Sequence, residues 1–177
     1  MNNNLIITIG REYGTGGREI GQKLALRLGV PFYDRELITR AAKKTGFDEK
    51  LFEQLDKRAT NSFLYSLTMF GSVGLNGMSL TDQLYLAQSN IIREMAEDSS
   101  CVIVGRCADH VLRDFPNKFD FFIHGSIEDR VKRVQTCGDY VIEGKTPEAA
   151  LEKMDKQRST YYNYYTGKVW GKCDHYD

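Results

Sequence analysis

A glycine-rich segment flanked by arginines is the part of the sequence best suited to bind an anion. Three glycines fall within residues 14–17, and arginines stand on either side at Arg11 and Arg18. The segment joins a β-branched apolar run to an amphipathic stretch, so we expect a turn that leads from a strand into a helix. Such a turn can direct successive backbone N–H groups toward a phosphate, and the helix dipole strengthens the attraction. The alternative is a tight turn that needs glycine only for its positive φ angles.

Polar side chains also follow two later apolar runs. Asp34 comes directly after the second run, with Arg40 in the stretch beyond it. Arg106 and Asp109 follow the third run, residues 101–104. Ligands of open parallel sheets collect beyond the carboxyl ends of the strands, and an arginine there can grip a phosphate through two parallel hydrogen bonds. For Arg106 the alternative is a surface ion pair.

The hydrophobic pattern predicts an α/β fold that would position these residues. Short apolar runs alternate with stretches in which apolar residues recur at helical spacing. Strands that are apolar on both faces are typical of a parallel sheet covered by helices on each side, so we expect a three-layer domain with a mostly parallel sheet. The expected strands are 5–9, 31–33, 101–104 and 119–123; the expected helices are 18–28, 35–44, 48–58, 81–97, 107–114 and two that begin after the capping residues Ser126 and Thr146.

Two regions depart from this alternation within what we expect to be a single domain, residues 1–177. Residues 59–80 are apolar and punctuated by glycine, which predicts an insert or acceptor-binding flap or, equally, a buried pair of helices. The region from about 126 to 170 is expected to be helical and lid-like. Its tyrosines at 161–165 favour packing of the lid helix or a contact in a homo-oligomer, with base stacking as the alternative.

Composition narrows the class of protein. The 177 residues carry 24 Lys plus Arg and 24 Asp plus Glu, so the chain lacks the basic surplus with which proteins attract nucleic acid through bulk phosphate contacts. No apolar run approaches the ~20 residues of a membrane span, and the four cysteines show no CxxC spacing. We therefore expect a cytoplasmic protein with reduced thiols, no membrane partner and no protein-held metal.

Three segments of the sequence, taken together, resemble the cytidylate-kinase-like branch of the P-loop nucleoside monophosphate kinases. They are the run from Ile9 to Gly21, the Pro-Phe-Tyr-Asp-Arg-Glu-Leu-Ile segment from Pro31, and Val-Ile-Val-Gly-Arg-Cys-Ala-Asp from Val102. The resemblance extends from residue 4 to about 177. It implies a five-stranded parallel sheet, and it matches the family's Asp-x-x-Arg lid motif to Asp155 and Arg158.

The sequence departs from the family pattern in the phosphate loop. Gly17 stands where the loop lysine is expected, and Glu19 stands where a hydroxyl would help to hold magnesium. Arg18, or Arg11 as its competitor, would then supply the missing positive charge. Cys107 replaces the aspartate of the Gly-Arg-Asp motif, with Asp109 close behind. The family continues into a last strand beyond this sequence, so either that strand is lost or the protein is longer.

The resemblance implies a phosphotransferase that moves the γ-phosphoryl group of ATP, with Mg²⁺, to a small acceptor, most favourably a nucleoside monophosphate such as CMP. The alternatives are a non-catalytic nucleotide- or anion-binding module, motivated by the missing lysine, and a kinase of a non-nucleotide metabolite. The expected donor-binding residues are Arg11, Gly14, Thr15, Gly16, Gly17 and Arg18; the acceptor-binding residues are Asp34, Arg40, Arg106 and Asp109; and the catalytic residues are Arg18, Arg130 and Arg158.

Overall fold

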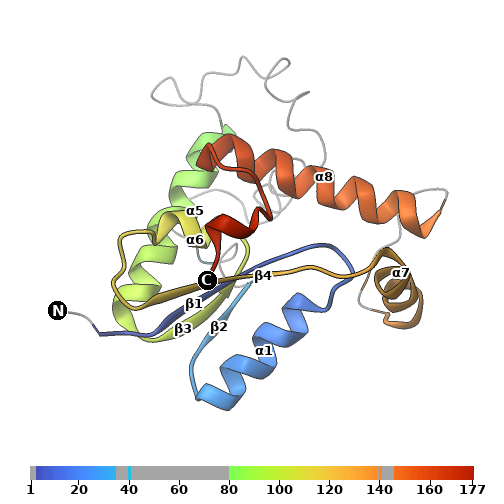
Figure 1. Cartoon of the computed structure of the whole chain (residues 1–177). Helices are drawn as coiled ribbons and strands as arrows, with labels where there is room; N and C mark the ends of the chain where they lie inside the picture. The colour runs from blue at the N-terminus through green and yellow to red at the C-terminus, as the bar shows by residue number, and fades with distance from the viewer. Residues whose placement is uncertain (1–2, 35–39, 41–79, 139, 141–145) are drawn as a thin grey trace.

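A four-stranded, all-parallel sheet forms the centre of the computed structural model, which describes residues 3–34, 40, 80–138, 140 and 146–177. The strands are β1 (Ile6–Arg11), β2 (Phe32–Tyr33), β3 (Cys101–Val104) and β4 (Lys118–Ile123). Their order in the sheet is β2-β3-β1-β4, so β1 lies between β3 and β4 (Figure 1). This arrangement confirms the predicted α/β fold with a parallel sheet flanked by helices.

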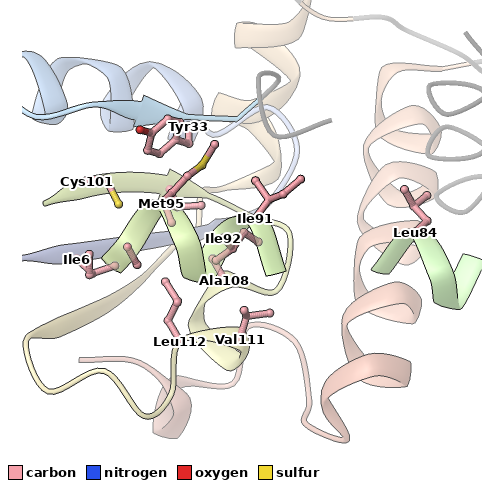
Figure 2. Close-up of a cluster of buried hydrophobic side chains, with 12 residues drawn as sticks. Ile6, Tyr33, Leu84, Ile91, Ile92, Met95, Cys101, Ala108, Val111 and Leu112 are labelled. Carbon is pink, nitrogen blue, oxygen red and sulfur yellow. The ribbon is translucent and has the colours of Figure 1, made fainter. Parts of the chain in front are cut away.

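Helices cover both faces of the sheet because successive strand residues point to opposite sides. On one face, Ile7 and Ile9 of β1 pack with Ala25 of α1 (Gly17–Leu28). On the other face, the alternate residue Ile6 packs against α5 (Leu80–Asp98) and α6 (Ala108–Val111). Figure 2 shows this second cluster, in which side chains of α5 and α6 converge on the sheet. The fully buried members of the cluster are Ile6, Ile92, Ala96, Cys101, Ile103 and Leu112.

Capping residues place the helix ends where the sequence predicted them. Gly29 ends α1 in the left-handed conformation, at φ +66°. The Ser126 side chain accepts a hydrogen bond from the backbone N–H of Asp129 at the start of α7 (Ile127–Thr136). Thr146 does the same for Ala149 at the start of α8 (Pro147–Thr166). A short 3₁₀ helix, η1 (Cys173–His175), follows α8.

Some expectations differ from the structure or lie outside it. The described residues form four strands rather than the five that the resemblance implied, and the backbone N–H of Asp177 donates to the Asp120 carbonyl of the edge strand β4. The short helix expected at 107–114 spans only Ala108–Val111. The helices expected within 35–58 lie outside the described residues apart from residue 40, and the insert expected at 59–80 lies outside them apart from residue 80. Within the described ranges, no helix has the length and apolarity needed to cross a membrane.

Candidate active site

The glycine-rich loop after β1 keeps its backbone amides available. Gly14 and Gly16 adopt positive φ angles of 83° and 77°, and Gly16 is the N-cap of α1. The Thr15 hydroxyl donates to the Glu12 carbonyl at 2.9 Å and so closes the turn on itself. The backbone N–H groups of residues 14–18 make no hydrogen bond to any of the described residues. Unpaired amides at a helix start are the arrangement that binds phosphate groups.

Crystals grown in ammonium sulfate test this arrangement directly. We expect an ordered sulfate whose oxygens lie about 2.7–3.2 Å from the amide nitrogens of residues 14–18, because these donors have no other acceptor among the described residues. Refinement of the sulfate at this loop in several crystal forms would exclude a lattice effect. Sulfate ions that bind elsewhere while only water occupies the loop would contradict the prediction.

Two residues of α7 and α8 hold the loop through its main chain. Asp155 accepts a hydrogen bond from the Tyr13 N–H at 2.7 Å, and Arg130 donates from Nε to the Tyr13 carbonyl at 2.7 Å. Arg130 also pairs with Asp155 and lies 3.5 Å from a Glu12 carboxylate oxygen. Only 7% of Arg130 is exposed. Its guanidinium is therefore committed to the loop and to α8, whereas the sequence predicted that it closes over the transferring group.

Arginines gather where the loop meets the carboxyl ends of the strands. Arg158 donates from Nη1 to the Arg11 carbonyl at 3.1 Å, and its guanidinium lies 5.1 Å from the Tyr13 ring centroid. Desolvation lowers the pKa of Arg11, and the positive charges of Arg158, Arg106 and Arg18 lower it further. Asp34 opposes that effect on Arg11.

Arg18 lies at the margin of this cluster. Its Nε donates to Asp34 Oδ2 at 2.9 Å, and half of its side chain is exposed, with the guanidinium 6.0 Å from the Phe32 ring centroid. An exposed pair of this kind contributes about 0–1 kcal/mol. From the sequence, Arg18 was expected to supply positive charge to a donor phosphate; in the structure its side chain pairs with Asp34.

A cavity of about 250 Å³ lies beside the arginines. Its walls come from β1, the turn after β3, α8 and the segment that follows α8. Three of the four acceptor-binding candidates meet there with Arg11 and Arg158. The fourth, Arg40, lies apart, with its guanidinium 5.7 Å from the Tyr33 ring centroid. The predicted residues that line the cavity are Arg11, Asp34, Arg106, Asp109 and Arg158.

The turn after β3 is strained where it borders the cavity. Gly105, Arg106 and Cys107 have consecutive positive φ angles of 76°, 60° and 54°. Non-glycine residues adopt this conformation at a cost, and such residues concentrate at functional sites. Burial raises the pKa of Cys107, which occupies the place of the family's aspartate, so its thiol stays protonated and unreactive.

The aromatic residues near the end of the chain divide into two groups. Tyr165 stacks on Tyr85 of α5 with ring centroids 3.9 Å apart, so it packs α8 against α5, which agrees with the packing role that the sequence favoured. Trp170 and Tyr176, by contrast, line the cavity because their segment folds back onto Phe122 of β4. The position of Trp170 and Tyr176 at the cavity could not be predicted from the sequence, because no local pattern indicates that the chain returns to the sheet.

A partly buried hydrogen bond joins two residues in the wall of the cavity, Tyr162 and Asp109. The Tyr162 hydroxyl donates to Asp109 Oδ2 at 2.6 Å. Desolvation raises the pKa of Asp109, with the Tyr162 hydrogen bond opposing that shift. The same environment raises the pKa of Tyr176 to about 12. The Asp109 carboxylate therefore accepts a hydrogen bond from Tyr162, although its partly desolvated surroundings disfavour its negative charge.

Asp109→Asn is expected to stabilise the free protein. A raised carboxyl pKa means that the folded state holds its proton to higher pH than the unfolded state, so the charge costs stability at neutral pH. The asparagine oxygen can still accept from Tyr162. At pH 7 the variant should melt at a higher temperature than the wild type, and the difference should shrink as the pH falls toward the unfolded-state pKa of about 4. A variant that melts lower at pH 7 would show that the Asp109 charge supports the fold.

A second cavity, of about 360 Å³, opens on the other part of the loop. It is lined by Gly14, Thr15 and three basic residues of α7, of which Arg133 lies closest to the loop: a Cβ added to Gly16 would come within 2.6 Å of its Cζ. Arg133 pairs with Glu19, which also binds Lys23 at 2.6 Å. Both partners lower the pKa of Glu19, and the hydrogen bond from Lys23 has the larger effect. The approach of Arg133 to the loop could not be predicted from the sequence, because more than a hundred residues separate Arg133 from the loop.

The fold is an all-parallel sheet flanked by helices, with a glycine-rich turn between β1 and α1, and comparison with known proteins gives the family. The model of the cytidylate kinase-like family matches residues 6–177, so the chain belongs to that family. A crystal structure of an uncharacterized protein from Eubacterium ventriosum is 33% identical, with a TM-score of 0.67 over 98% of this chain and 86% of that chain. Shikimate kinase from Acinetobacter baumannii in complex with shikimate is 15% identical, with a TM-score of 0.46 over 92% and 80%. No curated protein matches the chain.

Proposed function

We propose that the protein is an ATP-dependent phosphotransferase that acts on a small phosphorylated acceptor, most favourably a nucleoside monophosphate such as CMP. The observation that carries this proposal is the gathering of Arg11, Arg106 and Arg158 around one cavity. Arg11 also packs against Gly17, in the loop whose amides at residues 14–18 have no partner in the part of the chain that the structure describes. Transfer between two phosphorylated molecules brings several negative charges together, and its catalysis consists mainly of positioning and charge neutralisation.

The residues fit the phosphates that such a reaction requires. The loop amides suit the donor phosphates, and the second cavity beside Gly14 and Thr15, with Arg133 at its wall, suits the rest of the donor. Arg106 at the turn after β3 suits the acceptor phosphate, while Arg158 on α8 suits the group in transfer. ATP supplies the phosphoryl group, and Mg²⁺ supplies positive charge to the donor phosphates. Asp34 lines the cavity and is placed to orient the acceptor sugar or a water of the metal.

The placement of Arg130 suggests a different role from direct catalysis. Its contacts with Tyr13, Asp155 and Glu12 make it a positioning residue for the loop. We also propose that residues 1–177 form one domain, in which α7 and α8 act as the lid-like region expected at about 126–170.

Release of ADP from ATP–Mg²⁺ across a panel of acceptors tests the function. The panel contains all nucleoside monophosphates and a set of small hydroxylated metabolites, and ATP binding is measured in parallel by calorimetry. We expect turnover with a nucleoside monophosphate, CMP foremost. ATP binding without turnover on any acceptor would identify a nucleotide-binding module instead. Turnover confined to a non-nucleotide would change the acceptor class, and the absence of ATP binding would overturn the proposal.

A further inference from the structure

The first atoms of the Arg11 side chain lie against Gly17, the position at which the loop lysine is missing. A Cβ added to Gly17 would lie 2.6 Å from Arg11 Cβ and 2.9 Å from Arg11 Cγ. Real Cβ atoms do not approach other atoms so closely, so no side chain can begin at position 17 while Arg11 keeps this course. Position 17 therefore lacks a lysine because the side chain of Arg11 occupies the space that a lysine would need.

The far end of the same side chain reaches the carboxyl end of β3. A Cβ added to Gly105 would lie 2.2 Å from Arg11 Nη1, so the guanidinium packs against the Gly105 backbone. Arg11 thus passes from the end of β1, beside the first turn of α1, to the turn that carries Arg106. Its side chain lines the cavity along the way. Glycine at both 17 and 105 leaves the space that this course requires.

The surroundings of the Arg11 guanidinium favour a bound anion. It is desolvated, and Arg158, Arg106 and Arg18 all add repulsion, while Asp34 supplies the opposing charge. Asp34 is itself engaged by Arg18 at 2.9 Å. A desolvated cation with insufficient counter-charge is costly, and a phosphate in the cavity would offset that cost. The guanidinium fork also suits phosphate oxygens through two parallel hydrogen bonds.

We propose that Arg11 replaces the missing loop lysine as the cation that holds the donor phosphates. This inference rests on the proposed function, because it assumes that the loop binds a nucleotide. It selects Arg11 over Arg18, whose side chain is half exposed and paired with Asp34. The positive charge reaches the phosphate site from the strand that precedes the loop instead of from the first turn of the helix.

Calorimetric titration of ATP–Mg²⁺ into matched variants tests the assignment. Arg11→Met keeps the stem over Gly17 and removes the charge, so it should weaken binding roughly 10- to 100-fold, the scale of a lost charged hydrogen bond. Arg18→Ala should change affinity less than threefold, because an exposed pair contributes little. Arg27→Ala, on the exposed last turn of α1, is the control for charge loss. Arg11→Met should melt at or above the wild-type temperature, because a poorly compensated cation has been removed.

A relocation variant provides the decisive comparison. Combining Arg11→Gly with Gly17→Lys removes the Cβ that a side chain at 17 would meet at 2.6 Å and returns the cation to the position where the family has its lysine. This double variant should bind ATP–Mg²⁺ at least tenfold more tightly than Arg11→Gly alone. Gly17→Lys alone should bind weakly, because Arg11 occupies the space. A folded Arg11→Met that binds ATP like the wild type, an Arg11→Met that fails to fold, or a double variant without recovery would overturn the assignment. A wild-type protein that binds no ATP would overturn the proposed function with it.

Discussion

Replacing Arg158 with alanine is expected to lower the rate of phosphoryl transfer by roughly 10³-fold, the lower end of the effect of an arginine that stabilises this transition state. Arg158 lines the cavity, and its Nη1 donates to the Arg11 carbonyl at the end of β1. The other donors of its guanidinium fork are then placed to bind the equatorial oxygens of the group in transfer. Desolvation lowers the pKa of Arg158, which indicates a site where a bound anion would be strongly attracted.

Single-turnover kinetics at saturating ATP and acceptor measure this effect without interference from binding. Arg158→Lys is the matched variant, because it keeps the charge and loses the planar fork; we expect it to recover only part of the rate. Lys156→Ala, on an exposed turn of α8, controls for the loss of a charge on the same helix. A rate in Arg158→Ala within tenfold of the wild type would assign Arg158 to the support of the loop alone, through Arg11.

We expect Arg106 to lower the stability of the fold through its positive φ angle and to strengthen acceptor binding through its guanidinium. Two substitutions separate these effects. Both Arg106→Ala and Arg106→Gly remove the guanidinium, so both should weaken binding of the acceptor by about 1.5–3 kcal/mol. Only glycine relieves the backbone at φ 60°. Arg106→Gly should therefore be more stable than Arg106→Ala, by roughly 1 kcal/mol.

Urea unfolding of the two variants, together with calorimetric titration of the acceptor, checks both parts. Equal stability of the alanine and glycine variants would mean that the turn carries no strain at position 106. A large loss of stability in both variants with unchanged acceptor affinity would identify Arg106 as part of a structural ion pair, the alternative reading of its sequence position.

The sequence predicted the layered fold well because each element has a local signal. Gly29, Ser126 and Thr146 act within one helical turn, and the caps they form agree with the structure. The length of β1 was harder to predict. The apolar run ends at Ile9, but pairing of Gly10 with Phe122 and of Arg11 with Ile123 extends the strand to Arg11. Strand ends depend on the neighbouring strand, which the local pattern does not contain.

The site was predictable in its residue types and less so in its geometry. Polar residues after the strands led to Asp34, Arg106 and Asp109, all of which line the cavity. The choice between Arg11 and Arg18 depended on where two side chains of similar chemistry point. Because Arg11 belongs to β1, the strand and the glycines beside it direct its course. Those glycines lie at 17 and 105, so only the tertiary structure brings them together.

Helices α7 and α8 hold the loop through hydrogen bonds to the main chain of Tyr13. These anchors therefore bear on whether a phosphate loop from another protein could be transplanted here. Asp155 and Arg130 contact atoms that every residue type at position 13 except proline would supply in full. The attachment of the loop is therefore generic, while its charge is carried by a side chain. A lysine-bearing loop grafted between β1 and α1 would find its anchors already in place, provided that Asp155 and Arg130 are kept and residue 11 is replaced by glycine, which removes the Cβ that blocks position 17.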